Sequence, residues 1–230
     1  MKSHSLTRVA ISIVTILPGL AISAQAGPPL ICHPFAIGEA KTLPAVDFNW
    51  KGSGGYDLNN LNRDTLAILD SSAPVLVRME TLRRATIYAR QDPQLAKELI
   101  TRLKARADNS AAGLRALALF DFGYLVETYK QWIGVDEPNP AAGLDGYALI
   151  KKAISLRGPD PEMEFAAALV TLSGPESDHQ QHVRNAMVGA KNDPLLAQNV
   201  ASHFSRQTIS ELLSTPPAGE LREQGIGSRE

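Results

Sequence analysis

The sequence has little cysteine, few aromatic residues and no long apolar run in its body. Its 230 residues include one cysteine, Cys32, so an intramolecular disulfide is excluded and packing must stabilise the fold. Aromatic residues make up 6% of the chain against 44% hydrophobic residues in total, which predicts helices packed closely on small side chains. No run after residue 26 approaches the roughly 20 apolar residues of a membrane-spanning helix, so we expect no transmembrane span in the mature chain.

The common catalytic and nucleotide-binding motifs are also missing. The sequence contains no Gly-x-Ser-x-Gly, Ser-x-x-Lys, Gly-x-x-x-x-Gly-Lys or Gly-x-Gly-x-x-Gly motif, and the glycine-rich run 52–55 is expected to be a hinge. These absences disfavour the usual hydrolases, transferases and nucleotide-using enzymes, although they leave an unusual enzyme open. A net charge of −1 and few aromatics disfavour nucleic acid as a partner.

The first 26 residues have the three-part layout of a secretory signal peptide. Lys2 and Arg8 precede an apolar run at 9–17, and the small-residue motif 24–26 (Ala-Gln-Ala) precedes Gly27. The alternative is a retained anchor, which the shortness of the apolar run disfavours. We therefore expect cleavage near Ala26 and a periplasmic or secreted protein.

The rest of the chain divides into a strap, a helical domain and a tail. Prolines and glycines interrupt residues 27–55, but frequent apolar residues predict an extended strap lying on the body rather than a disordered segment. Residues 56–215 are predicted to be helical, and 216–230 to be a disordered tail. The expected helices cover about 60–70, a segment capped by Ser72 with Pro74 in its first turn, a segment from Asp92-Pro93, and 110–133, 144–157, 161–173, 177–191, 194–204 and 207–214.

Three Asp-Pro steps suggest a repeating architecture. They start at Asp92, Asp160 and Asp193, so their prolines lie 68 and 33 residues apart, close to two periods and one period of a 34-residue repeat. The pattern resembles the stacked helix pairs of the tetratricopeptide class, although the long helix at 110–133 occupies the place of a middle copy. The predicted fold is therefore all-α, with antiparallel helical hairpins stacked in a tetratricopeptide-like array.

The start of the mature chain carries a second resemblance. The run 27–35 (Gly-Pro-Pro-Leu-Ile-Cys-His-Pro-Phe), followed by Ile37-Gly38, resembles the mature start of a group of uncharacterised exported bacterial proteins with helical bodies. The similarity extends to the segment 123–131. It implies an exported location and a helical architecture, and it brings no activity with it.

A basic segment is the predicted contact region for a partner. Residues 78–106 contain eight cations and three carboxylates. The segment suits an acidic protein partner or an anionic envelope polymer, or else forms the solvated face of amphipathic helices that pairs with the acidic half of the chain. For the first interpretation the predicted contact residues are Arg78, Arg84, Lys97, Arg102 and Arg106.

Two groups of residues are candidates for metal or haem binding. Cys32 and His33 are adjacent, and His179 and His182 share one face of a helix at i,i+3 spacing. A Cys-x-x-Cys-His haem site is disfavoured because Pro29 stands where the first cysteine would be. Cys32 is alternatively a free or partner-linked thiol or a buried hydrophobe, and a surface helix with two solvated histidines is the preferred interpretation of the second pair.

Asp121 is the candidate for a buried carboxylate. It lies between two phenylalanines and on the apolar stripe of the longest predicted helix, where burial would raise its pKa and suit it to accept a proton or anchor a ligand. Alternatively it points to solvent or accepts a hydrogen bond from a partner such as Tyr124 or Arg115. Together these features favour a protein-interaction or scaffold module of the periplasm or envelope, with a small-ligand or metal-binding protein as the alternative.

Overall fold

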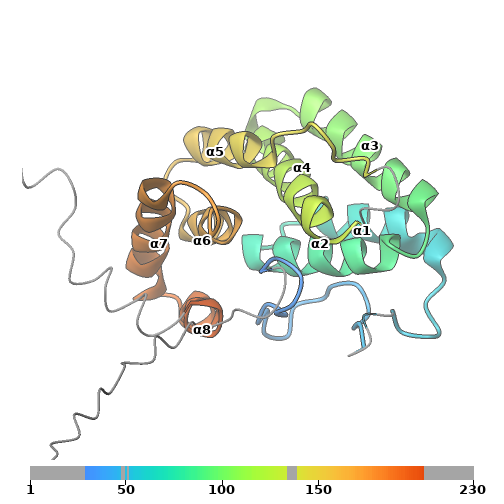
Figure 1. Ribbon diagram of the computed structural model, residues 1–230, viewed down its shortest axis with the longest axis horizontal. Helices are drawn as coiled ribbons and strands as arrows, with labels where there is room; N and C mark the ends of the chain where they lie inside the picture. Colours follow the sequence, from blue (N-terminus) through green and yellow to red (C-terminus); the bar gives the residue numbers. More distant parts are fainter. Residues whose placement is uncertain (1–28, 48–49, 51, 134–138, 205–230) are drawn as a thin grey trace, which may run out of the picture.

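The computed structural model describes residues 29–47, 50, 52–133 and 139–204, and within these ranges the fold is all helical (Figure 1). An isolated antiparallel bridge joins Val46 to Gly52. The elements are η1 (Leu58–Asn60), α1 (Leu61–Leu69), α2 (Val75–Ala89), α3 (Pro93–Asn109), α4 (Ala112–Trp132), α5 (Gly146–Arg157), α6 (Pro161–Val170), α7 (Glu176–Ala190) and α8 (Pro194–His203). The predicted signal peptide at 1–26, the predicted helix at 207–214 and the tail at 216–230 lie outside the described residues.

Neighbouring helices pack as pairs, which confirms the predicted stack of helical hairpins. α4 packs on α5, α6 packs on α7, and α7 packs on α8, while α2 and α3 both pack on α4. In Figure 1 the array runs from α1 to α3 on one side, through α4 and α5, to α6, α7 and α8 on the other. None of the helices described is both long and apolar enough to cross a membrane.

The three Asp-Pro steps begin helices, as predicted. Asp92, Asp160 and Asp193 are the N-caps of α3, α6 and α8, and a proline occupies the first turn each time. In each case one carboxylate oxygen accepts hydrogen bonds from the backbone N–H groups two and three residues further on. These N–H groups have no partner inside the helix, which is why the same dipeptide starts a helix three times.

The predicted cap of α2 was wrong. Ser72 does not cap this helix, because α2 begins after Pro74, whose side chain has no atom that could accept a capping hydrogen bond. The cap comes instead from α6, where the Glu162 carboxylate accepts from the Leu76 N–H at 2.9 Å. Burial raises the pKa of Glu162, while its backbone hydrogen bond from Leu76 lowers it. A tertiary contact between residues 86 positions apart thus replaces the expected local cap.

α4 is the central helix, as its apolar sequence predicted, and it packs against α2, α3, α5 and α6. Two glycines bring α4 close to α5. A Cβ on Gly123 would lie 2.7 Å from the Gly146 carbonyl oxygen, and a Cβ on Gly146 would lie even nearer to the Gly123 carbonyl oxygen. No larger residue fits at either position without moving one helix, so the pair fixes the distance between α4 and α5.

The described part of the strap, residues 29–47, lies along α2 and reaches α8 (Figure 1). Its apolar side chains Leu30, Ile31, Phe35 and Leu43 are buried. The Asn199 side chain of α8 pairs with the backbone of Ala36 through two hydrogen bonds of 2.9 Å.

A buried ionic cluster on α2 holds the strap backbone. The Glu80 carboxylate accepts from the Phe35 N–H and also pairs with both Arg83 and Arg84. Arg83 donates to the Ile31 carbonyl oxygen at 2.8 Å, and Arg84 donates to the Leu43 carbonyl oxygen at 2.6 Å. We call Glu80, Arg83 and Arg84 the strap cluster. Its hydrogen bonds satisfy backbone groups of the strap, which belongs to no sheet within the described ranges.

Candidate functional site: an arginine-lined cleft

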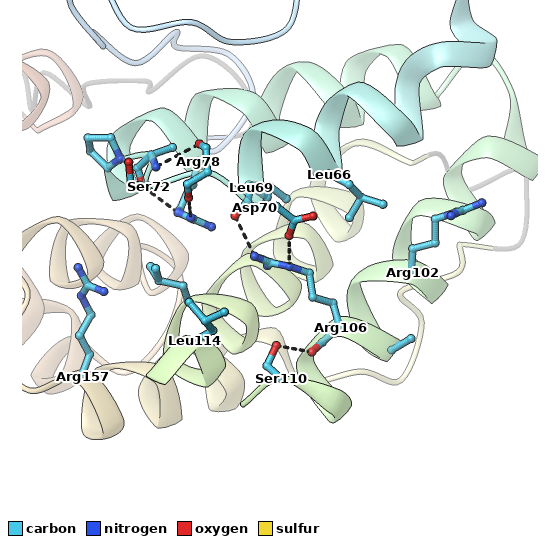
Figure 2. A pocket seen from close by; sticks show the side chains of 15 residues that line it. Leu66, Leu69, Asp70, Ser72, Arg78, Arg102, Arg106, Ser110, Leu114 and Arg157 are labelled. Carbon is cyan, nitrogen blue, oxygen red and sulfur yellow. Dashed lines mark hydrogen bonds and ion pairs between the residues drawn. The ribbon is translucent and has the colours of Figure 1, made fainter. Parts of the chain in front are cut away.

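A cleft of about 990 Å³ opens between the α1–α2 connection, α3, the start of α4 and the end of α5 (Figure 2). Its volume lies within the range of ligand-binding pockets. We call it the arginine cleft. Its lining residues are Leu66, Leu69, Asp70, Ser71, Ser72, Ala73, Pro74, Arg78, Arg102, Ala105, Arg106, Ser110, Leu114, Leu117 and Arg157.

Two of the lining arginines meet at Asp121, which is completely buried on α4. Arg78 of α2 and Arg106 of α3 each donate from Nη1 to the same oxygen, Oδ2, at 2.7 Å. The other oxygen, Oδ1, has no hydrogen-bond partner. We call Arg78, Asp121 and Arg106 the cleft cluster. The sequence offered Asp121 as a candidate buried carboxylate, with exposure to solvent or a partner such as Tyr124 or Arg115 as alternatives. The structure buries it, and its partners are Arg78 and Arg106.

Backbone carbonyls hold both guanidinium groups in place. Arg78 also donates to the carbonyl oxygens of Ala73 and Ser71. Arg106 also donates to the carbonyl oxygen of Leu69 and to the Asp70 carboxylate, as Figure 2 shows in part. A guanidinium carries five N–H donors, so these three contacts leave each arginine with donor capacity. The α1–α2 connection therefore positions two cations at the cleft without exhausting them.

Burial dominates the protonation of Asp121. It raises the pKa of this carboxyl from 3.8 to about 6, although the charges and hydrogen bonds of Arg78 and Arg106 lower it. The upward direction of this pKa shift follows from the geometry, because ionising the buried carboxyl leaves the negative charge on Oδ1 without solvent or a hydrogen-bond partner.

The rim of the cleft carries arginines that reach solvent. Arg102 and Arg157 are 53% and 43% exposed, and they lie at opposite ends of the view in Figure 2. Arg102 pairs with Glu98 on its own helix, and Arg157 pairs with Asp160. Both guanidinium groups are accessible to solvent, where ion pairs contribute little energy, so an incoming anion can compete for them. It does so more easily at Arg102 than at Arg157, whose partner Asp160 is only 13% exposed.

Apolar side chains form the rest of the wall. Leu66, Leu69 and Leu117 line the cleft together with Leu114, which is 61% exposed and among the most exposed large hydrophobic residues of the described chain. A second hollow of about 540 Å³ shares Pro74 and Arg157 with the cleft, so the depression continues past the start of α2. An elongated occupant fits this shape better than a compact one.

The chemistry of the lining favours binding over catalysis. The side chains lining the cleft include four arginines but only one carboxylate, Asp70, and no histidine, lysine or cysteine that would activate a nucleophile. The Ser71 hydroxyl donates to the Ile68 carbonyl oxygen, and the Ser110 hydroxyl donates to that of Arg106. The arrangement suits an anion with apolar neighbours.

The structure places the five predicted contact residues in different environments. Arg78 is only 1% exposed because it is held by Asp121, and Arg84 is engaged in the strap cluster. Lys97 is exposed on α3 but does not line the cleft. Arg102 and Arg106 do line it. Reasoning from sequence missed Arg157, since it lies far along the chain from the basic segment.

The metal-binding candidates lie in two different parts of the fold. Cys32 is half-buried and its pKa is raised by burial, while the ring of His33 packs edge-on against His203 with centroids 5.7 Å apart. Nδ1 of His179 donates to the Ala168 carbonyl oxygen at 3.0 Å, and burial lowers the pKa of this imidazole.

His182 lies in a polar network between α5, α6 and α7. It contacts the Glu164 carboxylate through Nδ1 and the Tyr147 hydroxyl through Nε2. The prediction of two solvated histidines is therefore wrong, because both imidazoles of α7 contact residues of α6. Across the residues that the structure describes, no group of three or more His, Cys, Asp or Glu side chains is placed to hold a metal ion.

Comparison of the chain with protein-family models, with curated proteins and with solved structures finds no match in any of the three. The arginine cleft is thus defined by its own geometry and charge.

Proposed function

We propose that this protein is an interaction module of the periplasm or cell envelope, which binds an acidic and partly apolar segment of a partner protein in the arginine cleft. The observation that carries the proposal is the lining, where four arginines, already paired with Asp121, Asp70, Glu98 and Asp160, lie beside an apolar wall. The exported location rests on the sequence of residues 1–26.

Charge complementarity selects the chemistry of the partner. Arginine pairs with carboxylates in a bidentate geometry, and the rim arginines Arg102 and Arg157 can exchange their present partners, Glu98 and Asp160, for the carboxylates of a bound segment. Leu114 and Leu117 offer apolar surface between these cations. Since the two rim cations lie at opposite ends of the cleft, a segment with spaced acidic residues and apolar residues between them matches both features (Figure 2).

The test is direct binding of a defined probe. A fluorescent peptide of alternating Glu and Leu should bind, and the same peptide should lose affinity when Lys replaces Glu or when Ser replaces Leu. Affinity should fall as salt is added, because the rim contacts are exposed to solvent. Fluorescence anisotropy measures all three comparisons.

A matched pair of charge reversals locates the binding. The double variant Arg102→Glu/Arg157→Glu should weaken binding by about tenfold or more, since it turns two attractive contacts into repulsive ones. The control Lys97→Glu/Lys104→Glu changes the net charge equally at exposed positions of α3 that do not line the cleft. This control should change affinity by less than about threefold.

Three results would contradict the proposal. One is the absence of peptide binding, and another is an equal loss in both double variants, which would show attraction by net charge alone. The third is self-association of the chain that Arg102→Glu/Arg157→Glu abolishes, which would assign the cleft to a second copy.

A further inference from the structure

The charges at the inner wall of the cleft balance only while Asp121 is ionised. Arg78 and Arg106 contribute two positive charges, and Asp121 and Asp70 contribute two negative charges. An anion that enters beside Arg106 adds a negative charge to this neutral group. The nearest buried charge that can be removed in response is that of Asp121.

Asp121 has a free position for a proton. Both arginines donate to Oδ2, and Oδ1 has no partner, so a proton on Oδ1 leaves both arginine contacts in place. Protonation weakens these hydrogen bonds without breaking them, because Oδ2 remains an acceptor. The positive charge of each guanidinium is then less neutralised, so it attracts an incoming anion more strongly.

We propose that binding of an acidic segment in the arginine cleft is coupled to uptake of one proton by Asp121, so that the protein holds its partner more tightly in acid. This inference rests on the proposed function and names how the same site is regulated. The geometry that carries it is the cleft cluster, with two cleft-lining arginines sharing one oxygen of a buried carboxylate.

The charged groups around Asp121 come from the helices packed on α4. α2 contributes Arg78 and α3 contributes Arg106, and these two cations lower the pKa of Asp121. Arg157 of α5 lines the same cleft, and Glu162 of α6 lies beyond it at the start of α2. The balance between burial and the two arginines gives Asp121 a pKa of about 6, so its proton is exchanged in a range that solution experiments reach easily.

The sign of the effect follows from linkage. A bound anion disfavours the ionised carboxylate and raises the pKa of Asp121 above its value of about 6 in the free protein. Affinity therefore increases as the pH falls from above the bound pKa to about 6, and levels off below it. A rise of about one unit in the pKa corresponds to about tenfold tighter binding.

The experiment uses a peptide that does not itself titrate. Alternating cysteic acid and Leu keeps a sulfonate charge at every pH, and binding to the full-length protein is measured by calorimetry at pH 8 and pH 5.5. At an intermediate pH, two buffers with different ionisation enthalpies give the number of protons taken up. We expect about tenfold tighter binding at pH 5.5, and a rise of about one unit in the pKa gives net uptake of about half a proton midway between the free and bound pKa values.

Asp121→Asn, which stays uncharged, should bind the peptide with nearly the same affinity at both pH values. Equal affinity of the unmodified protein at pH 8 and pH 5.5 without proton uptake would overturn the inference and leave the proposed function standing. Retention of the pH dependence in Asp121→Asn would also overturn it. Absence of binding at both pH values would overturn the proposed function and this inference together. The calorimetry on the unmodified protein decides the matter even if the variant fails to fold.

Discussion

The strap cluster and the cleft cluster contain the same groups, one buried carboxylate and two arginines, but the chain assembles them differently. Glu80 pairs with arginines three and four residues further along the same helix. Asp121 pairs with arginines that lie 43 and 15 residues away, on two other helices. The first cluster is thus built by one helix, and the second exists only when three helices are packed.

The two carboxylates also differ in how fully their oxygens are satisfied. Glu80 accepts four hydrogen bonds, two on each oxygen, from Arg83, Arg84 and the Phe35 N–H. Asp121 accepts two, both on Oδ2. A buried charge is tolerated when hydrogen bonds replace its hydration, so the strap cluster is suited to hold structure and the cleft cluster to change its protonation.

Removing the charge of Glu80 should have the largest effect on stability. In Glu80→Gln the buried Arg83 loses its counter-charge, and we expect the free energy of unfolding to fall by about 3–5 kcal/mol. Urea denaturation measures this loss. Hydrogen exchange should also accelerate at the Phe35 amide, which donates to Glu80.

Glu98→Gln is the matched control for this variant. Glu98 pairs with Arg102 at the same i,i+4 spacing as Glu80 with Arg84. The side chains of Glu98 and Arg102 are both exposed, however. Glu98→Gln should therefore lower the free energy of unfolding by less than about 0.5 kcal/mol. Similar losses in the two variants would show that burial adds nothing to the strap cluster.

Asp121→Asn should have the next largest effect, seen in the pH dependence of stability. The folded protein holds the Asp121 proton more tightly than the unfolded chain, because the pKa rises from 3.8 to about 6. The stability that this proton contributes is fully present below about pH 4 and is lost as the pH rises through about 6. The loss amounts to about 3 kcal/mol, since one pKa unit corresponds to about 1.4 kcal/mol.

The measurement compares urea unfolding of the two proteins from pH 4 to pH 7. Other carboxyl groups contribute to both curves, so the difference between them isolates Asp121. Relative to the unmodified protein, the free energy of unfolding of Asp121→Asn should rise by about 2.5 kcal/mol from pH 4 to pH 7, because part of the full effect is already lost at pH 4. A flat difference, or one of the opposite sign, would mean that Asp121 is satisfied as fully as Glu80.

The parts of the fold that depend on neighbouring residues could be predicted from the sequence. Asp92-Pro93 and its two counterparts start helices because the cap needs only the next three residues. The apolar stripe of its own helix also made Asp121 a candidate for burial, although it left exposure to solvent open. The cap of α2 could not be predicted in this way, because it comes from Glu162.

The arginine cleft depends on contacts between distant residues, and its composition was only partly predictable. Arg102 and Arg106 were among the predicted contact residues, together with Arg84 of the same basic segment. The spacing of Glu80 to Arg83 and Arg84 already allowed an ion pair on the helix itself, which would have removed Arg84 from that set. No local pattern indicates that Arg157 joins Arg102 and Arg106, since only the packing of α5 on α4 brings it there.

Asp70→Asn should have the smallest effect, because Asp70 pairs with Arg106 from an exposed position. Its side chain is 63% accessible, and water can replace the contact when the charge is removed. We expect the free energy of unfolding to change by less than about 1 kcal/mol in urea denaturation, although the same arginine also belongs to the cleft cluster. A decrease in the free energy of unfolding as large as that of Glu80→Gln would show that Arg106 depends on Asp70 more than on Asp121. Exposed and buried ion pairs would then contribute alike, and the comparison of the two clusters depends on their difference.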